Sequence, residues 1–460
     1  MKLRPLLLWL SVALLAPVRL SAGVGVWSAT PNPGARSVVV GPDGAVYTDW
    51  GTVVSYQIAR SADHGVSWQP SSGPGEVGFS FYQTRALAVD PSGAIYAAFN
   101  AGGNANFHAE LSVSRDAGAS WTLLLTEMET QYLDLRVDPF SPQTLYLLDG
   151  LGGLFGHLRR SSDGGAHWTA IDGTLVGGIG AQGAVTALAL DSKTPGRLYA
   201  ATVGPSGVLP PVPSFFTSSD GGSTWTRSAA IPPGTFATLV VDPFQPSTIY
   251  GGGPSGIFRS EDGGKTFVLR NAAAAVQIVA DPAQAGRLYA ATPGSGVLAT
   301  ADAGTSWTPS NAGLTNLQTT AIALDASGGY LYAATNTGLF AFESLPPGAL
   351  VLDASHPFTI TLAATDQRTG RTGSGVATAV NDLWGYFSIP AITNNPGNPE
   401  VFVKMLDGTG LNGRYWFFYG GLTDLEYTLT VRESATGLTK TYTKPAGSEC
   451  GGSDTAAFGP

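Results

Sequence analysis

One eight-residue motif recurs six times in the chain and constrains its fold more than any other feature. The motif runs Ser/Thr-x-Asp-x-Gly-x-x-aromatic. Self-similarity of this kind predicts a repeat architecture, in which each unit buries its apolar face against the next unit. The copies are SADHGVSW (Ser61 to Trp68), SRDAGASW (Ser114 to Trp121), SSDGGAHW (Ser161 to Trp168), SSDGGSTW (Ser218 to Trp225), SEDGGKTF (Ser260 to Phe267) and TADAGTSW (Thr300 to Trp307).

The chemistry of the motif predicts a tight turn between two strands. The Asp side chain accepts hydrogen bonds from backbone amides of the turn, and the Gly permits a positive φ. The Ser or Thr caps the same turn, and the aromatic ring packs between sheets. A carboxylate that is engaged in its own turn is a structural group rather than a catalytic one. This interpretation covers Asp63, Asp116, Asp163, Asp220, Asp262 and Asp302.

A second pattern occurs seven times between the motifs. It is an apolar strand, a short turn usually opened by Asp-Pro, and an apolar strand with a Tyr, as in RALAVDPSGAIYAAF from Arg85 to Phe99. The tyrosines recur at intervals of 39 to 53 residues, which is typical of four-stranded propeller blades. One Tyr per repeat favours a place in the core between blades over a ligand site. They are Tyr47, Tyr96, Tyr146, Tyr199, Tyr250, Tyr289 and Tyr332.

Seven strand pairs and six motifs leave one blade without a fourth strand. The last repeat, residues 321–342, is followed by no motif, whereas GVGVWSAT (Gly23 to Thr30) can supply the strand, with Trp27 in the place of the motif's aromatic residue. Pairing of the chain ends closes the ring and removes exposed sheet edges. The sequence therefore predicts an all-β chain with a seven-bladed β-propeller over residues 23–345.

The eight-residue motif resembles the Asp-box, or BNR repeat, of sialidases, sortilin-type receptors and photosystem II assembly factors. The resemblance covers residues 27 to 342 and implies a propeller of the kind that holds peptides or proteins. A sialidase would also carry an arginine triad, with one arginine in an Arg-Ile-Pro motif, and a Tyr-Glu nucleophile pair. The chain has no such motif, and Tyr82 and Tyr132 have no recognisable glutamate partner, although Glu129 lies close to Tyr132 in sequence. No catalytic residue is assigned.

The first 22 residues predict a secretory signal peptide. Lys2 and Arg4 give a positive start, residues 6–16 an apolar stretch, and Ser21-Ala22 a small-residue cleavage point. An apolar stretch of about eleven residues is too short to span a bilayer. We therefore expect a mature chain without a membrane span, secreted or held in the periplasm or cell envelope.

The chain changes character after the proline-rich linker that begins at residue 346. Residues 346–460 alternate apolar and polar positions, which predicts an accessory β-sandwich. The string NPEVFVKMLDG is similar to an accessory module at the C-termini of secreted bacterial proteins. Elsewhere in residues 346–460, Trp416, Phe417 and Phe418 are consistent with a ligand platform, but the sequence favours core packing for them. The single cysteine, Cys450, cannot form an internal disulfide.

Chain order places the long loops on one face of the propeller. The motifs and the Asp-Pro turns share one face, and the insertions at 69–83, 100–110, 171–183 and 203–214 share the other, where binding is expected. Arg36 and Arg85 begin the innermost strand in successive blades and can face an anion together. Paired carboxylates at a suitable separation would instead support glycoside hydrolysis. The candidate ligand-face residues are Arg36, Arg85, Tyr82, Phe107, His108, Glu110, Glu127 and Glu129.

Composition narrows the possible partners. The net charge of −9 and pI near 5.0 argue against nucleic acid and against an anionic membrane surface. Five His, none paired at ligand spacing, and one Cys predict neither a metal site nor a cofactor. The sequence favours an exported, monomeric, non-enzymatic binding or scaffold protein that docks a protein, peptide or glycan on the long-loop face. Two alternatives stay open: a sialidase-like or polysaccharide-acting glycoside hydrolase with an atypical carboxylate site, and an extracellular structural protein.

Overall fold

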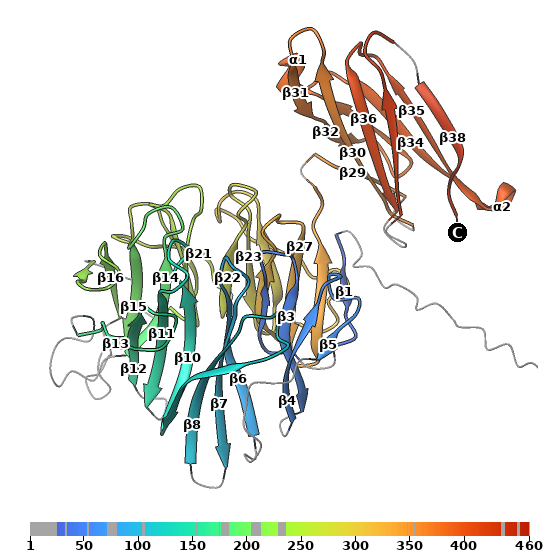
Figure 1. The fold of residues 1–460 in the computed structure, drawn as a ribbon. Coiled ribbons are helices and arrows are strands. Elements are labelled where there is room, and N and C mark those ends of the chain that lie inside the picture. Colours follow the sequence, from blue (N-terminus) through green and yellow to red (C-terminus); the bar gives the residue numbers. More distant parts are fainter. Residues whose placement is uncertain are drawn as a thin grey trace, which may run out of the picture.

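The computed structural model describes residues 25–459, apart from 33–34, 53–54, 71–80, 104–105, 152–154, 174, 176–183, 204–212, 229–235, 347, 354–355, 434–437 and 449–450 (Figure 1). The proposed signal peptide, Cys450 and most of the insertions at 69–83, 171–183 and 203–214 fall outside the described residues. The fourth predicted insertion, 100–110, is not a long loop, because all but two of its residues belong to two paired strands. The described part is built of strands and contains only two helices, each of four residues. The predicted all-β class is confirmed.

Six antiparallel sheets of four strands follow one another along the propeller chain. In each, the strand order in space is the order in sequence, so every sheet is a series of hairpins. The first three are β2 (Val38–Val40), β3 (Val46–Thr52), β4 (Ser55–Ser61) and β5 (Gln69–Pro70); β6 (Phe81–Val89), β7 (Ile95–Gly103), β8 (Asn106–Ser114) and β9 (Thr122–Met128); and β10 (Thr130–Val137), β11 (Leu145–Leu151), β12 (Phe155–Ser161) and β13 (Thr169–Ala170).

The next three sheets repeat this plan with shorter strands. Their second strands carry the repeated Tyr, and all seven such tyrosines are buried because each ring packs in a core that neighbouring sheets share. These sheets are β14 (Ala184–Leu190), β15 (Leu198–Val203), β16 (Ser214–Ser218) and β17 (Thr226–Arg227); β18 (Thr238–Val241), β19 (Ile249–Gly253), β20 (Gly256–Ser260) and β21 (Val268–Asn271); and β22 (Gln277–Ala280), β23 (Leu288–Thr292), β24 (Gly296–Thr300) and β25 (Thr308–Pro309).

A seventh four-stranded sheet joins the two ends of the propeller chain. Its order is β1-β28-β27-β26, so the N-terminal strand occupies the outer place that the fourth strand takes in the other sheets. Trp27 stands opposite Phe342 in this pairing. The number of four-stranded sheets in the described chain therefore equals the number of predicted blades. The strands are β1 (Trp27–Ala29), β26 (Thr319–Leu324), β27 (Tyr330–Thr335) and β28 (Gly338–Glu343).

The six motif turns share one hydrogen-bond pattern, which Asp116 illustrates. Its Oδ1 accepts hydrogen bonds from the Ser114 hydroxyl at 2.8 Å and the Ser120 amide at 2.8 Å, and its Oδ2 accepts one from the Ser120 hydroxyl at 2.5 Å. Gly118 has a φ of 91°, which few residues other than glycine adopt. The hydrogen bonds from Ser120 lower the pKa of Asp116 to about 2. The corresponding carboxylates accept equivalent bonds at Asp63, Asp163, Asp220, Asp262 and Asp302.

Two five-stranded sheets follow the propeller and stand apart from it (Figure 1). Their inward residues form one core, in which Phe358 of one sheet and Phe417 of the other are completely buried. One sheet contains β29 (Leu350–Leu352), β30 (Phe358–Asp366), β31 (Arg371–Ser374), β36 (Glu426–Glu433) and β37 (Thr439–Lys444). The other contains β32 (Val376–Ala379), β33 (Trp384–Ser388), β34 (Val401–Gly408), β35 (Arg414–Gly421) and β38 (Gly451–Phe458). The helices are α1 (Pro390–Thr393) and α2 (Thr409–Asn412).

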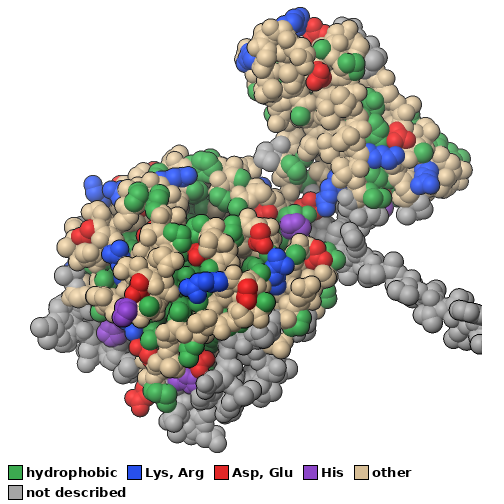
Figure 2. All heavy atoms as spheres, viewed as in Figure 1, with side chains coloured by type: hydrophobic (Ala, Val, Ile, Leu, Met, Phe, Trp, Pro, Cys, Tyr) green, Lys and Arg blue, Asp and Glu red, His purple; other side chains and the backbone are tan. Residues whose placement is uncertain are grey.

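The surface carries charges of both signs. Figure 2 shows Lys and Arg side chains interspersed with Asp and Glu on the visible side of the propeller. Within the described residues, no helix is long and apolar enough to cross a membrane. The same residues contain no group of three or more His, Cys, Asp or Glu placed to hold a metal ion.

Candidate functional site at the central channel

A cavity of about 260 Å³ opens at the end of the propeller where the innermost strands begin. Because alternate turns of a hairpin series lie on opposite faces, this end is the predicted long-loop face. Residues in or just before the innermost strand of all seven propeller sheets line the cavity, so the sheets surround one central channel. One such residue per sheet is Arg36, Arg85, Leu133, Thr186, Thr238, Gln277 and Thr320.

β-Bulges place side chains in this cavity, which we call the channel mouth. The register of the innermost strand shifts by one residue in four of the seven sheets, within β6, β10, β14 and β26. A bulge inserts one unpaired residue and re-aims its side chain, and bulges are common at the rims of barrels. The inserted residues all line the cavity: Arg85, Leu133, Thr186 and Thr320.

Two arginines lie together at this mouth, as the sequence predicted. Arg36 and Arg85 are both exposed and line the same cavity. Desolvation, followed by the positive charge of Arg36, lowers the pKa of Arg85. Within the described residues neither guanidinium forms an ion pair. The mouth therefore holds two like charges whose repulsion a bound anion would relieve.

Asp49 lies close to Arg36 but is directed at the backbone. Its Oδ1 accepts hydrogen bonds from the amides of Arg36 at 2.8 Å and Ser37 at 2.9 Å. Burial raises the pKa of Asp49, against the effect of these hydrogen bonds. Asp49 therefore fixes the backbone that carries Arg36, and the Arg36 guanidinium makes no ion pair with the residues that the structure describes.

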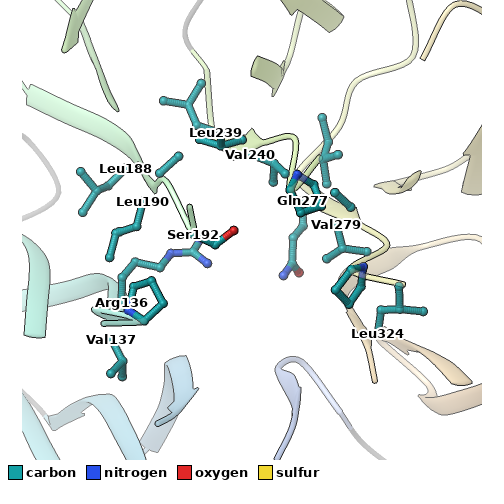
Figure 3. Close-up of a pocket in the computed structure, with 17 residues that line it drawn as sticks. Arg136, Val137, Leu188, Leu190, Ser192, Leu239, Val240, Gln277, Val279 and Leu324 are labelled. Carbon is teal, nitrogen blue, oxygen red and sulfur yellow. The ribbon is translucent and has the colours of Figure 1, made fainter. Parts of the chain in front are cut away.

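A second cavity, of about 430 Å³, occupies the channel on the side of the Asp-Pro turns. Its wall is mainly apolar, with Leu190, Leu239 and Leu324 among its side chains. Arg136 and Gln277 line both cavities, and Figure 3 shows them extending into the opening from opposite sides. The Arg136 Nε donates a hydrogen bond to Asp134 at 2.9 Å, so this cation is paired within its own strand.

Glu127 is part of an ion-pair network between the second and third blades. Arg159 donates to both of its carboxylate oxygens, at 2.9 and 2.5 Å, and contacts Asp149 at 2.5 Å. The Tyr132 hydroxyl also donates to Glu127, at 3.2 Å. The hydrogen bond from Arg159 lowers the pKa of Glu127, and burial raises that of Asp149. Glu127 is thus an anchored carboxylate.

The inference that Tyr132 has no glutamate partner is wrong, because a partner five residues away cannot be recognised without the hairpin that brings it close. Tyr132 and Glu127 do pair, but Tyr132 is completely buried, and this burial raises the pKa of its hydroxyl. A phenol that is hard to ionise and has no access to solvent is poorly suited as a nucleophile. The pair therefore stabilises the contact between the blades.

The remaining candidate residues belong to the second blade, which comprises β6 to β9, and to the turn that follows it. His108 and Glu110 form a buried pair, with 2.8 Å between Nε2 and Oε1. Glu129 is exposed, with a positive φ of 61°, at the turn between β9 and β10. Tyr82 and Phe107 lie in β6 and β8, but their side chains fall outside the described part. Among the candidates whose side chains the structure describes, Arg36 and Arg85 are the two that line the channel mouth.

The sequence analysis did not identify Arg136, which lies between the two cavities of the channel, although the sequence contains a signal for it. Arg136 lies two residues before the Asp that opens the turn, and it is the only charged residue at this position among the seven repeats. The other repeats carry Val39, Ala88, Ala189, Val240, Val279 and Ala323 there.

No protein-family model matches the chain, and neither does any curated protein. Solved structures with a similar chain path include YCF48 bound to D1 peptide, at 13% identity and a TM-score of 0.49, over 70% of this chain and 95% of that chain. For YCF48 from Cyanidioschyzon merolae, the identity is 13% and the TM-score is 0.46, over 69% of this chain and 98% of that chain. For a xyloglucanase from Xanthomonas campestris, the identity is 13% and the TM-score is 0.35, over 95% of this chain and 99% of that chain. At this similarity, function has to be argued from the residues of this chain.

Proposed function

We propose that the chain is an exported, non-enzymatic binding protein that docks a protein or peptide partner on the long-loop face of its propeller. An acidic group of the partner lies at the channel mouth, between Arg36 and Arg85. The observation that carries this proposal is the pair of neighbouring guanidinium groups in one cavity, without an ion-pair partner among the described residues.

Other arginines near this face are already neutralised. Arg136 pairs with Asp134, and Arg159 pairs with Glu127 and Asp149. A carboxylate between Arg36 and Arg85 would accept charge-assisted hydrogen bonds from both guanidinium groups. The strand that carries Arg85 is hydrogen-bonded within a four-stranded sheet, so its backbone is already ordered before a ligand binds.

The state of the acids supports binding over glycoside hydrolysis. Hydrolysis needs one carboxyl group that protonates the leaving group and a second that attacks or activates water. Glu127 is held by Arg159, and Glu110 is buried beside His108. Glu129 alone among the three candidates is exposed.

The first test is the affinity of the full chain for a fluorescein-labelled octapeptide of alternating Glu and Gly, measured by fluorescence anisotropy. A peptide with Gln in place of Glu is the neutral reference. Arg36→Gln and Arg85→Gln should each weaken binding of the acidic peptide about tenfold, the loss expected for one hydrogen bond to a charged group. Arg368→Gln, which changes a highly exposed arginine of the C-terminal module, is the matched control.

Two outcomes would contradict the proposal. One is binding of the acidic peptide that both channel-mouth variants leave unchanged. The other is release of sugar from a panel of polysaccharides and sialylated glycans, provided that Glu110→Gln, Glu127→Gln or Glu129→Gln abolishes the release. The second outcome would establish the hydrolase alternative.

A further inference from the structure

One sheet of the C-terminal module is aromatic on both of its faces. Its inward side chains, such as Phe387 and Phe417, are completely buried in the core between the two sheets. The expectation that Trp416 and Phe418 also lie in this core is wrong, because the alternation of the strand turns them outward. A sheet with one covered face normally carries polar residues on its outer face. Here five half-buried aromatic residues lie on that outer face: Trp384, Tyr386, Phe402, Trp416 and Phe418.

Strand register arranges these outer residues in rows. Trp384, Lys404, Phe418 and Ser453 are direct partners across β33, β34, β35 and β38, so they project from the same side of the sheet. Neighbouring strands lie about 4.8 Å apart, which places the first and third members of this row about 10 Å from each other, with Lys404 between them.

The next row along the sheet adds two further rings and two glycines beside the first row. It consists of Tyr386, Phe402, Gly420 and Gly451. The rings of Phe402 and Trp384 have centroids 6.4 Å apart. The two rows form an aromatic face, which we define as Trp384, Tyr386, Phe402, Lys404 and Phe418 with Gly420.

A hollow of about 590 Å³ lies over this aromatic face. Gly420 forms part of its floor, and a Cβ added there would meet no atom within 4 Å. Its φ also lies outside the left-handed region, so neither packing nor backbone conformation requires glycine. Glycine weakens a strand interior. The consequence of glycine at this position is an open floor between the aromatic rings.

Aromatic residues are not a general feature of the surface of the module, because the outer face of its other sheet is polar. The outward positions of β30 and β36 include Thr361, Thr428, Thr430 and Arg432. These polar side chains are what a solvated sheet face is expected to carry. The aromatic face is therefore a local property of one side of the module.

Two cations accompany the rings. Lys404 lies at the centre of the aromatic face, and Arg414 lies four residues from Phe418 along β35, on the same side of the sheet. Both side chains are exposed and form no ion pair within the described residues. Two separate cations on one side of the sheet suit a ligand that carries carboxylates at intervals along its length.

We propose that the aromatic face binds an acidic polysaccharide. The apolar faces of two sugar rings of one polymer chain stack on Trp384 and on Phe418, with a sugar between them, which removes apolar area from water. A uronate carboxylate pairs with Lys404 between them, and a further one pairs with Arg414. The shallow, open shape suits a polymer that continues beyond the site, whereas small-molecule sites enclose most of their ligand. A nucleic acid strand carries a phosphate at every nucleotide and would require a continuous positively charged groove, whereas this face offers two separate cations, Lys404 and Arg414.

The test is isothermal titration of the full chain with polygalacturonate, with fully methyl-esterified polygalacturonate as the uncharged counterpart. We expect Trp384→Ala to weaken binding of both polymers about tenfold, because both use the stacking contact. Lys404→Gln should weaken binding of the acidic polymer alone. Gly420→Leu should abolish binding, because it fills the floor of the hollow, whereas Thr430→Leu on the opposite sheet should have no effect.

Thermal unfolding of each variant verifies that the fold is retained. Arg368→Gln, which changes an exposed arginine elsewhere in the C-terminal module, should leave polygalacturonate binding unchanged, so a loss seen for Lys404→Gln is not a general effect of removing positive charge. Failure of the wild-type chain to bind polygalacturonate would overturn the proposal, as would binding that Gly420→Leu leaves intact. Concentration-dependent dimerisation that Gly420→Leu abolishes would also overturn it, because a second copy of the chain would then cover the aromatic face.

Discussion

Trp27 and Phe342 lie directly opposite each other in the sheet that joins the two ends of the propeller chain, with ring centroids 5.2 Å apart. Trp27 is almost completely buried, and its Nε1 donates a hydrogen bond to the Ser310 carbonyl at 2.6 Å. Strand β1 is only three residues long. Closure of the ring therefore combines a short stretch of backbone pairing with the packing of this one side chain.

Replacement of Trp27 by Ala should destabilise the propeller strongly. Removal of a buried Trp costs about 3–5 kcal/mol of unfolding free energy, because the lost burial and the cavity left behind add together. Urea unfolding followed by far-ultraviolet circular dichroism measures this change. Val26→Ala is the matched control, since Val26 is the adjacent residue and is 41% exposed. A loss below about 1 kcal/mol for Trp27→Ala would show that β1 does not hold the ring closed.

The motif turns should make the propeller sensitive to acid. The hydrogen bonds of Asp116 and Asp220 hold the pKa of each carboxyl at about 2, below its usual value of 3.8. A depressed folded-state pKa contributes stability that is fully present above the unfolded-state value and is lost as pH falls through the folded-state value. We therefore expect the urea midpoint to fall between about pH 4 and pH 2.

The Asp116→Asn variant tests this assignment. Its stability should depend less on pH in that interval than the stability of the wild-type chain, and it should be lower at neutral pH because the amide cannot accept all the hydrogen bonds. Glu129→Gln, which changes an exposed carboxylate, is the control. Equal acid slopes for Asp116→Asn and the wild-type chain would contradict the assigned role of the turn.

The ion-pair network around Arg159 should contribute to the unfolding free energy, because it joins the second and third blades. Arg159→Met would leave the buried Asp149 and the half-buried Glu127 without their counter-charge, and breaking a buried ion pair in this way costs about 3–5 kcal/mol. The double variant Arg159→Met/Asp149→Asn should recover part of this loss. Urea unfolding of the single and double variants forms a double-mutant cycle. Strictly additive effects would mean that Arg159 and Asp149 are not coupled.

The repeat architecture could be predicted from the sequence because each of its signals is local. The turn motif contains its own hydrogen-bond partners within six residues, and the tyrosines mark the second strand of every sheet. Closure of the ring by Trp27 was also predictable, since the last repeat lacks a strand and Trp27 matches the motif's aromatic residue.

The site was harder to predict because its contacts join residues from different strands and blades. The pairing of Glu127 with Arg159 spans 32 residues, and the bulge that inserts Arg85 has no sequence signature. The outward aromatic face was missed for a different reason. Consecutive aromatic residues at 416–418 suggest a core strand, but alternation sends only Phe417 inward.

The contact between the propeller and the C-terminal module gives the last prediction. Arg432 of β36 forms an ion pair with Glu343, the last residue of β28, and both side chains are mostly buried. Burial raises the pKa of Tyr330, which lies beside the pair. Because the linker after β28 is short, this ion pair restricts how the module is oriented on the propeller. Arg432→Gln should therefore broaden the range of orientations, at a cost of about 1 kcal/mol or less.

Small-angle X-ray scattering at low salt should show a larger radius of gyration for Arg432→Gln than for the wild-type chain. Arg368→Gln, which removes an ion pair within the module, should leave the scattering unchanged. High salt should bring the wild-type chain closer to the variant, because salt screens partly exposed ion pairs. Identical scattering of the variant and the wild-type chain at low salt would mean that the ion pair does not determine the orientation of the module.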